Sequence, residues 1–447
     1  MRNYDLIVIG SGSGMNVVNQ GLAHGLKVAL IEKDLLGGTC LNVGCIPSKM
    51  LIYPADVIAQ IKDSAKLGVK AEVKSVDFNK IMNNMRQSIK KSREHMEDGI
   101  NQPENLDYYH EKAEFKSDYT IKAGSEELRS NKIVIAAGAR PFIPPIKGVE
   151  KVKYLTNESL LELKKKPKSL IIIGGGYIGC EYAHFFSSIG TKVTVIQRNK
   201  YLVPNEEPGV SELLAKMMKR RMEVHTNTKA TELKEESGLI KAVTDGKIFR
   251  AEQLLMAVGR RPNSDLLKVE KTGVEVDDKG FIKVNDYYET SREGIYALGD
   301  ITGRAMFKHV ANLEASYISG NLFHDKKQSI DYSKIPHAVF SHPQIAGVGL
   351  TEAEARENHQ LLVGKAGYDS VAKGEAMMAQ GFAKAIVDKD TNKILGFHII
   401  GKYAPILIQE VINLMAQDLE YHEIDKGMHI HPALPELIIS ALSSLEG

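Results

Sequence analysis

The chain has 447 residues, of which 26% are charged, a formal net charge of +2 and only three cysteines. Its length suggests about three domains, and its balanced charge gives no reason to expect nucleic acid or an anionic membrane as a partner. No apolar stretch approaches the roughly 18 residues of a membrane span, so the sequence predicts neither a signal peptide nor a transmembrane helix. Few cysteines without an export signal indicate a reducing, cytoplasmic compartment.

The N-terminal segment has the pattern of a strand, a glycine turn and a helix. The apolar run 4–9 leads into three glycines: Gly10, Gly12 and Gly14. Such glycines let the backbone approach a pyrophosphate, whose charge is favoured at a helix N-terminus. The next strand, 27–32, ends at Glu32, where a ribose-binding carboxylate is expected. Met15 occupies the third glycine position of the fingerprint, so the close helix-to-strand contact must be made differently.

Two of the three cysteines, Cys40 and Cys45, lie in the segment 37–49 and are separated by four residues. On an ideal helix they would be about 8.6 Å apart, which exceeds the roughly 7 Å limit for a disulfide. The pair therefore needs a turn or a distorted helical turn, which the glycines of this segment permit. A bridge across so short a loop constrains little unfolded-chain entropy, so a redox-active dithiol is favoured over a structural bridge. A zinc site is not supported, because no further Cys or His lies nearby at ligand spacing.

One-sided apolar spacing predicts helices through residues 51–100, and short strand-like runs lead from there to residue 141. A second strand, 169–173, precedes a complete G-x-G-x-x-G motif made by Gly174, Gly176 and Gly179, and a helix is expected over 181–189. The following strand, 192–196, ends in Gln197 and Arg198 instead of an acid. Because the segment after this unit repeats the pattern of 133–141, the chain carries two related nucleotide-binding units.

The remaining sequence contains one further ligand-binding candidate, and its pattern of strands and helices changes from about residue 334. A strand over 295–300 places Asp300 at its carboxyl end, where ligands bind in open α/β sheets. From about residue 334, strand-like segments alternate with the helical segments 351–357 and 406–416, without a glycine phosphate turn. This pattern predicts a separate α+β domain.

The whole chain resembles the class I pyridine nucleotide-disulfide oxidoreductases. The resemblance rests on the segment 37–49, both glycine motifs, 297–300 and 429–436. It implies an α/β fold with two Rossmann-like dinucleotide-binding domains and a C-terminal α+β dimerisation domain. The implied limits are 1–148 with 265–333 for the FAD-binding domain, 149–264 for the NAD(P)-binding domain and 334–447 for the dimerisation domain.

The resemblance also implies roles for single residues. Cys45 would be the thiolate in charge transfer with the flavin, and Cys40 the thiol that attacks the substrate disulfide. His431, oriented by Glu436, would carry protons in the partner subunit's active site of a homodimer. An ion pair beside the flavin N5 would be formed by Lys49 and Glu181. The implied cofactor-binding residues are Gly10, Gly12, Gly14, Glu32, Lys33, Gly38, Thr39, Ala137, Gly138, Asp300, His309, Gly174, Gly176, Tyr177, Ile178, Gln197, Arg198 and Gly259. Cys180 is expected to be an inert packing residue.

We therefore expect a flavoprotein that passes electrons from NAD(P)H through FAD and the cysteine pair to a small disulfide. The segments 49–55, 308–312 and 431–436 are similar to mycothione reductase and archaeal low-molecular-weight disulfide reductases, which favours mycothione or bis-γ-glutamylcystine as the substrate type. The segment 38–49 is similar to dihydrolipoamide dehydrogenase, which is the alternative. Mercuric reductase is disfavoured, because its C-terminal cysteine pair is absent. A non-enzymatic flavoprotein would be expected to have lost a cysteine of the pair or His431. This sequence retains all three residues, which disfavours that alternative.

The end of the strand 192–196 favours NADPH over NADH. A carboxylate there would bind the ribose 2′-hydroxyl and repel a 2′-phosphate, whereas Gln197 is neutral. Arg198 and Lys200 supply donors and positive charge suited to a phosphate. Gly179 argues against a preference for NADPH, because several NADPH enzymes carry alanine at that position.

Overall fold

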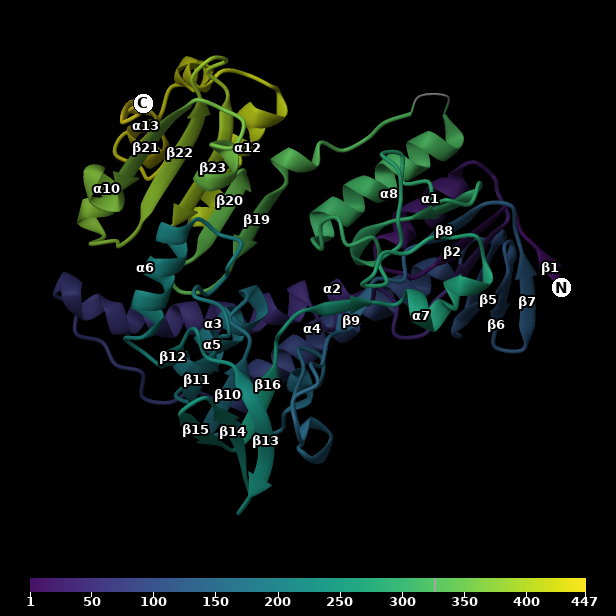
Figure 1. Ribbon diagram of the computed structural model, residues 1–447, viewed down its shortest axis with the longest axis horizontal. Coiled ribbons are helices and arrows are strands. Elements are labelled where there is room, and N and C mark those ends of the chain that lie inside the picture. The colour runs from purple at the N-terminus through teal and green to yellow at the C-terminus, as the bar shows by residue number, and fades with distance from the viewer. Residues whose placement is uncertain (325–326) are drawn as a thin grey trace. The chain divides into compact units, whose positions relative to one another are not determined.

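The structure is a computed structural model that describes residues 1–324 and 327–447 (Figure 1). Its contacts divide it into two compact units, each assembled from separate stretches of the chain. Unit 1 comprises Met1–Ser48, Met82–Phe142 and Gly259–Tyr332, and unit 2 comprises Lys49–Ile81, Ile143–Val258 and Ser333–Gly447.

Unit 1 is built on a parallel five-stranded sheet of order β18-β8-β2-β3-β4. The strands are β2 (Leu6–Ile9), β3 (Val28–Ile31), β4 (Leu106–Tyr109), β8 (Ile133–Ile135) and β18 (Ile295–Ala297). Strands β2, β3 and β8 are uninterrupted apolar runs that are buried on both faces, as expected for a covered parallel sheet. Helices α1 (Gly14–Ala23) and α8 (Lys308–Phe323) pack against each other in this unit.

Smaller elements complete unit 1. A four-stranded sheet has the order β1-β7-β6-β5, and β9 pairs with β17 in an antiparallel ribbon. Their bounds are β1 (Arg2–Asn3), β5 (Ala113–Ser117), β6 (Thr120–Ala123), β7 (Glu126–Arg129), β9 (Ala139–Pro141) and β17 (Arg260–Pro262). Helix α4 (Phe78–Ile100) contributes most of its length to this unit.

Unit 2 contains a second parallel sheet and an antiparallel one. The parallel sheet has the order β12-β11-β10-β16, with β10 (Ser169–Ile173), β11 (Lys192–Ile196), β12 (Glu223–His225) and β16 (Gln253–Met256). Helix α5 (Tyr177–Ser188) connects β10 to β11, helix α6 (Pro208–Met218) follows, and β13 (Ala230–Glu236), β14 (Leu239–Thr244) and β15 (Lys247–Ala251) form a meander.

The C-terminal part of unit 2 is an antiparallel five-stranded sheet of order β19-β20-β23-β22-β21. Its strands are β19 (Pro336–Val339), β20 (Ile345–Gly349), β21 (Leu361–Gly367), β22 (Phe382–Asp388) and β23 (Ile394–Ile400). Helices α12 (Gln409–Ala416) and α13 (Glu436–Ser443) contribute apolar side chains to the core of this sheet. Two Rossmann-like units and a C-terminal α+β part confirm the expected fold class.

Several expected helices differ from the observed ones. The prediction of helices throughout 51–100 is wrong in the middle: α3 (Cys45–Asp63) and a short 3-10 turn (Ser64–Leu67) end at Gly68, whose φ of +81° stops the helix, and α4 begins only at Phe78. Helix α5 begins at Tyr177, directly after the glycine turn, and not at 181. The expected helix 351–357 is reduced to α9 (Glu352–Ala355), and 406–416 is divided between α11 (Ala404–Leu407) and α12.

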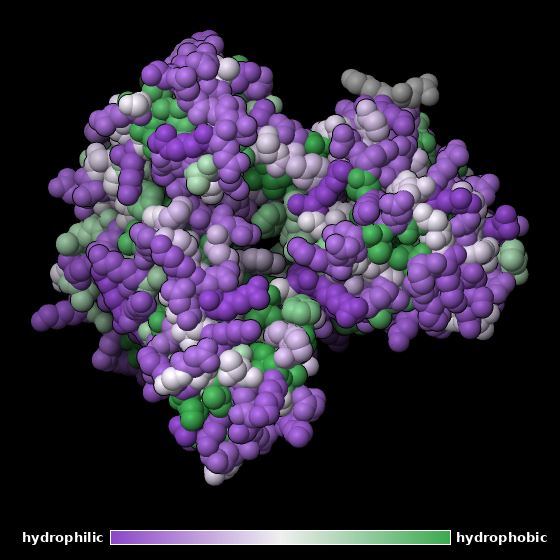
Figure 2. Space-filling view, in the orientation of Figure 1, coloured by the Kyte–Doolittle hydropathy of each residue, from purple (hydrophilic) through white to green (hydrophobic). Residues whose placement is uncertain are grey.

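On the face shown in Figure 2, hydrophilic residues cover most of the surface and apolar residues form separate patches. Within the described residues, none of the helices combines the length and apolar character that crossing a bilayer requires.

Candidate active site

The two cysteines of the predicted dithiol lie in unit 1, on two consecutive helices. Helix α2 (Gly38–Asn42) carries Cys40, and α3 begins at Cys45. The break between the helices depends on Gly44, because a Cβ there would lie 2.8 Å from the Thr39 carbonyl oxygen and 3.3 Å from the Cys40 Cα. The chain thus folds back on itself at Gly44, which brings the cysteines together without a continuous helix between them. The two cysteines are not joined by a disulfide in this structure.

The dithiol has an asymmetric proton distribution. The hydrogen bond with Cys45 and burial both raise the pKa of Cys40, while the positive charge of Lys308 acts in the opposite direction. Cys40 therefore holds its proton more strongly than an exposed thiol and shares it with the Cys45 sulfur. This arrangement favours Cys45 as the site of negative charge in the reduced pair.

The first glycine turn is held by the acid that the sequence singled out. Glu32 is buried, and its Oε2 accepts hydrogen bonds from the Ser11 N–H at 2.9 Å and the Ser11 hydroxyl at 2.7 Å. The Ser11 hydroxyl oxygen also accepts from the Gly37 N–H at 3.0 Å, which links the turn to the segment before α2. Lys33, next to Glu32, pairs with Asp34.

The close helix-to-strand contact that Met15 cannot provide is made one residue earlier. A Cβ on Gly14 would lie 3.0 Å from Val8 Cγ1 and 3.1 Å from Ala136 Cβ. Gly10 has a φ of +104°, and a Cβ there would meet the Ala136 carbonyl oxygen at 2.3 Å. The backbone of the turn consequently passes directly beside β2 and the end of β8.

Other predicted cofactor residues gather at the carboxyl ends of the unit 1 strands. Asp300 pairs with Arg260, whose Nε lies 3.2 Å from Oδ2. Burial raises the pKa of Asp300, and the neighbouring guanidinium opposes this shift. Asn263 binds the backbone of two predicted residues, because its amide donates to the Ala137 carbonyl at 2.8 Å and its N–H to the Gly138 carbonyl at 3.1 Å.

The other predicted residues of unit 1 lie near the starts of helices α2 and α8 and directly before β17. The Thr39 carbonyl accepts the Val43 N–H at 2.9 Å, which closes α2. His309 is exposed, and its ring stacks on Phe307 with 5.4 Å between the ring centroids. Gly259 adopts a φ of +134° directly before β17. Gly12 and Gly38 lie against each other with no side chain between them, so the turn and α2 present bare backbone to a ligand.

The second glycine turn repeats the hydrogen bonding of the first. Gln197 Oε1 accepts from the Gly175 N–H at 3.1 Å, as Glu32 does from Ser11, and the Gln197 amide donates to the Tyr201 carbonyl at 3.1 Å. Gly174 has a φ of +108°, and a Cβ there would meet the Ala257 carbonyl oxygen at 2.2 Å, which parallels Gly10. The internal duplication therefore extends from sequence to individual contacts.

Around this turn the predicted residues occupy different environments. Gly176 is the N-cap of α5, and Tyr177, the first residue of the helix, is 40% exposed. Ile178 is half-buried, and Arg198 is exposed at the end of β11. Cys180 is fully buried, and burial raises the pKa of its thiol, as expected for an inert packing residue.

Lys49 and Glu181 form a tight ion pair in unit 2. The Lys49 ammonium lies 2.9 Å from both carboxylate oxygens of Glu181, and this carboxylate is almost completely buried. The Phe340 N–H donates to Glu181 Oε1 at 3.0 Å, and the Phe340 ring lies under the ammonium with 4.5 Å to its centroid. Because three elements hold the pair, the ammonium has a fixed position four residues after Cys45 on α3.

His431 and Glu436 form a second pair in unit 2. His431 Nδ1 lies 2.8 Å from Glu436 Oε1, and Glu436 Oε2 accepts the Ala433 N–H at 2.9 Å. The hydrogen bond with His431 lowers the pKa of Glu436. Because a carboxylate oxygen can only accept, Nδ1 donates this hydrogen bond, and the imidazole is 73% exposed. The structure therefore places three predicted pairs: the two cysteines in unit 1, and the lysine and histidine pairs in unit 2.

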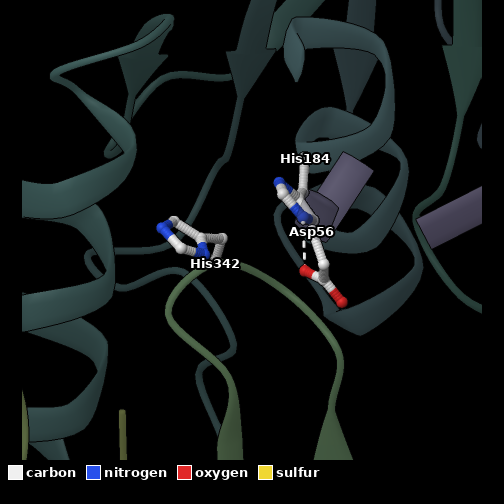
Figure 3. A group of neighbouring side chains, drawn as sticks. All are labelled: Asp56, His184 and His342. Carbon is white, nitrogen blue, oxygen red and sulfur yellow. Dashed lines mark hydrogen bonds and ion pairs between the residues drawn. The ribbon is translucent and has the colours of Figure 1, made fainter. Parts of the chain in front are cut away.

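A further cluster in unit 2 has the composition of a metal site: Asp56, His184 and His342 (Figure 3). Its hydrogen bonds argue against metal binding. Arg221 donates to His184 Nδ1 at 3.0 Å, so the ring proton is on Nε2, which lies 2.9 Å from Asp56 Oδ1. Burial lowers the pKa of His184 to about 4, so the ring stays neutral. A metal cation bound at His184 Nε2 would have to displace this proton and would lie close to the positively charged Arg221 guanidinium. We therefore interpret the cluster as a structural hydrogen-bonded contact.

Sequence reasoning missed Lys308, whose charge acts on both cysteines. It also missed Phe340 and Arg260, which support predicted residues. These contacts join segments that are far apart in the sequence, so no local spacing rule could identify them. The similarity of the segment 308–312 to mycothione reductase pointed to this region but gave Lys308 no role.

Comparison with known proteins identifies the family. Residues 4–315 match the family model of the pyridine nucleotide-disulphide oxidoreductases, and residues 335–442 match the model of their dimerisation domain. The chain belongs to the pyridine nucleotide-disulphide oxidoreductase family. This confirms the resemblance seen in the sequence, and the dimerisation domain indicates a homodimer.

The relatives of this oxidoreductase span its full length. It is 35% identical to mycothione reductase of Mycobacterium tuberculosis strain H37Rv, with 100% of both chains covered. It is 31% identical to dihydrolipoyl dehydrogenase of Chlamydia trachomatis, covering 97% of this chain and 95% of the relative. The HOCl-induced flavoprotein disulfide reductase RclA from Escherichia coli matches with a TM-score of 0.89 at 27% identity, covering 98% and 99% of the two chains. The protein is thus an NAD(P)H-dependent flavoprotein disulfide reductase that uses FAD.

Proposed function

We propose that the enzyme reduces a small disulfide of the mycothione or bis-γ-glutamylcystine type with electrons from NADPH. The observation that carries the proposal is the pairing of Cys40 with Cys45 across the break at Gly44. Bound FAD supplies the two-electron relay between the nicotinamide and this pair. The bare turn at Gly10 and Gly12, with the acids Glu32 and Asp300 at strand ends, fits a dinucleotide in unit 1.

The proposed substrate chemistry is two thiol–disulfide exchanges. Cys40, after losing its proton, attacks one sulfur of the substrate disulfide, which breaks the S–S bond and releases the first thiol when the leaving thiolate is protonated. The Cys45 thiolate then attacks the Cys40 sulfur of the mixed disulfide. The second substrate sulfur leaves as a thiolate that takes up a proton from solvent, and the Cys40–Cys45 disulfide forms. Reduction of that disulfide by the two electrons of one NADPH completes the cycle.

Cys40 requires a base because its proton is held by the hydrogen bond to Cys45 and by burial. We assign this role to His431, whose Nδ1 is fixed by Glu436 and whose ring is exposed. The same imidazole, once protonated, can protonate the leaving substrate thiolate. Two exposed apolar residues, Met428 at 98% and Ile430 at 77%, precede it in the sequence. Exposed apolar residues at this place fit a loop that enters a partner subunit.

The preference for NADPH is proposed from Gln197 and Arg198. Gln197 makes the turn contact that an acid makes in the first unit, without the charge that would repel a 2′-phosphate. Arg198 is the next residue in the sequence and is exposed, whereas Gln197 is buried. Replacing Arg198 with alanine should lower kcat/KM for NADPH by an amount equivalent to about 1.5–3 kcal/mol and change kcat/KM for NADH little. Lys247→Ala, which removes an exposed lysine on β15 of the same unit, is the control for a general loss of positive charge. Equal losses with both nucleotides would contradict the proposal.

The substrate is tested by one panel with lipoamide, mycothione disulfide, bis-γ-glutamylcystine, glutathione disulfide and coenzyme A disulfide. We expect the highest kcat/KM with NADPH and mycothione disulfide or bis-γ-glutamylcystine. The full-length match to mycothione reductase supports this order. A rate of dihydrolipoamide oxidation by NAD⁺ far above all the reductions would establish the alternative, dihydrolipoamide dehydrogenase.

The roles of the two cysteines are tested by spectroscopy. The holoenzyme should be yellow, and two-electron reduction should give a long-wavelength thiolate-to-flavin charge-transfer band. Cys45→Ser should abolish the band, whereas Cys40→Ser should keep it. A full-strength band in Cys45→Ser would show that the assignment is reversed.

A further inference from the structure

Lys308 is a charged residue of unit 1 to which the proposed chemistry gives no role. It is the first residue of α8, and its side chain is half-buried. Its ammonium donates a hydrogen bond to the Ser13 hydroxyl at 2.9 Å, and that hydroxyl donates to the Asn312 side-chain oxygen at 2.9 Å. Asn312 lies one helical turn after Lys308 on α8. The hydrogen bond to Ser13 therefore fixes the position of the ammonium, which would be mobile in an exposed surface lysine.

The contact brings Lys308 to the corner of unit 1 that holds the dithiol. Ser13 follows Gly12, and the Gly12 backbone lies against Gly38, where an added Cβ would be only 2.8 Å from the Gly12 Cα. Gly38 begins α2, and Cys40 is two residues further along that helix. The glycine turn therefore touches both the lysine and the helix that carries the first cysteine.

The electrostatics agree with this placement. Negative charge on Cys40 and Cys45 raises the pKa of Lys308, against the larger lowering by burial. In return, the ammonium lowers the pKa of Cys40, against the hydrogen bond and burial that raise it. A half-buried cation interacts strongly with a thiolate, because little water lies between the charges.

We propose that Lys308 is a positioning residue of the reduced enzyme, whose ammonium, directed by Ser13, holds the dithiol in the form with one thiolate and one thiol. This inference rests on the proposed roles of the two cysteines. It gives the enzyme a cation beside the dithiol within the same subunit, in addition to the imidazole of His431 that the proposed partner supplies. Lys49, on α3, is already paired with Glu181 and has its charge compensated.

The consequence is a pH dependence with a definite sign. The charged groups that face the thiolate are the ammonium of Lys308, the other cysteine and the partner's proposed imidazole. A fixed cation favours the thiolate, so the charge-transfer band of the two-electron-reduced enzyme should persist to lower pH. Removing the cation should move the midpoint for loss of the band upward by about one pH unit. The same change should slow alkylation of the reduced dithiol by iodoacetamide near pH 6.

The test compares three variants of the FAD-loaded enzyme with wild type. Lys308→Met should show the raised midpoint and the slower alkylation, while Lys308→Arg keeps the charge and should restore a midpoint near the wild-type value. Lys122→Met removes one exposed lysine on β6, in the four-stranded sheet of unit 1, and controls for net charge. FAD affinity is measured in parallel by the fluorescence of the released flavin.

The outcomes separate the possible explanations. An unchanged midpoint in FAD-loaded Lys308→Met overturns the inference. Weakened FAD binding with an unchanged midpoint would assign Lys308 to the cofactor site, which also overturns it. If wild type forms no charge-transfer band on two-electron reduction, the proposed function itself fails, and this result is distinguishable because it precedes any effect of the variants.

Discussion

Replacing Gly38 with alanine should separate helix α2 from the glycine turn. Gly38 has a φ of +62°, and the added Cβ would lie 2.8 Å from the Gly12 Cα and 3.2 Å from the Gly12 nitrogen. Ordinary contact begins near 3.4 Å, so one of the two backbones must move by about 0.6 Å. Both atoms belong to main chain, which cannot rotate away as a side chain would.

Gly25 offers a matched control in the same unit. Its φ of +73° is similar, but among the described residues no atom lies within 4 Å of an added Cβ. Gly25→Ala therefore carries only the cost of a left-handed alanine, about 1–2 kcal/mol, which Gly38→Ala shares. The difference between the two variants isolates the contact between α2 and the turn.

We expect both variants to melt at a lower temperature and only Gly38→Ala to lose cofactor affinity. A 0.6 Å displacement at the turn should raise the Kd for FAD by about tenfold or more, equivalent to about 1.4 kcal/mol. It should also weaken the charge-transfer band, because α2 carries Cys40 and leads directly into the start of α3 at Cys45. The assays are titration of apoprotein with FAD, monitored by flavin fluorescence, and reductive titration of the holoenzyme. Equal FAD affinity in the two variants would refute the reasoning.

Three further predictions concern the proposed shared site and two buried contacts of unit 2. Inactive Cys40→Ser and His431→Ala subunits should regain activity when mixed, because a heterodimer contains one complete shared site; no recovery after verified subunit exchange would contradict sharing. Lys49→Met leaves the buried Glu181 carboxylate unpaired and should lower stability by about 2–3 kcal/mol, at the low end for a broken buried pair because Lys49 is one-third exposed; a melting temperature equal to that of wild type would disprove this. Burial lowers the pKa of His184 to about 4, so as the pH falls through about 6.5 the unfolded chain binds a proton first. Stability is then lost towards pH 4 at up to about 1.4 kcal/mol per pH unit. His184→Gln should show a shallower decline of melting temperature over that range, and an equally steep decline would exclude His184 as the cause.

The sequence predicted those parts of the structure that are encoded within short segments. Each dinucleotide-binding unit combines an apolar strand, a glycine turn and a helix within about 30 residues, and the structure has this pattern at both predicted places. The division of the region 51–100 was missed, because apolar spacing predicts a helix on either side of residues 68–77 without marking where each one ends, whereas the left-handed conformation of Gly68 ends the first. The role of Gly14 was missed for a similar reason, since the fingerprint assigns the close contact to the position of Met15.

Some contacts of the candidate site could be predicted from the sequence and others could not. The pairs formed by the cysteines and by His431 with Glu436 involve residues at most five positions apart, so their proximity follows from local geometry. Lys49 and Glu181 are 132 positions apart, and only the resemblance to the family suggested their pairing. Lys308 had no such guide: its contact with Ser13 spans 295 positions and depends on the packing of α8 beside the glycine turn.

Gln197 also constrains how cofactor preference can change by mutation. Its amide accepts from Gly175 and donates to the Tyr201 carbonyl, so one side chain anchors both the glycine turn and the loop that carries Arg198 and Lys200. A glutamate could keep the bond to Gly175 but would face the Tyr201 carbonyl with no proton to donate. An acid at this position would thus release the basic loop as well as repel a 2′-phosphate. Given the proposed NADPH preference, we expect a mutational path towards NADH use to need a second, compensating substitution near residue 201.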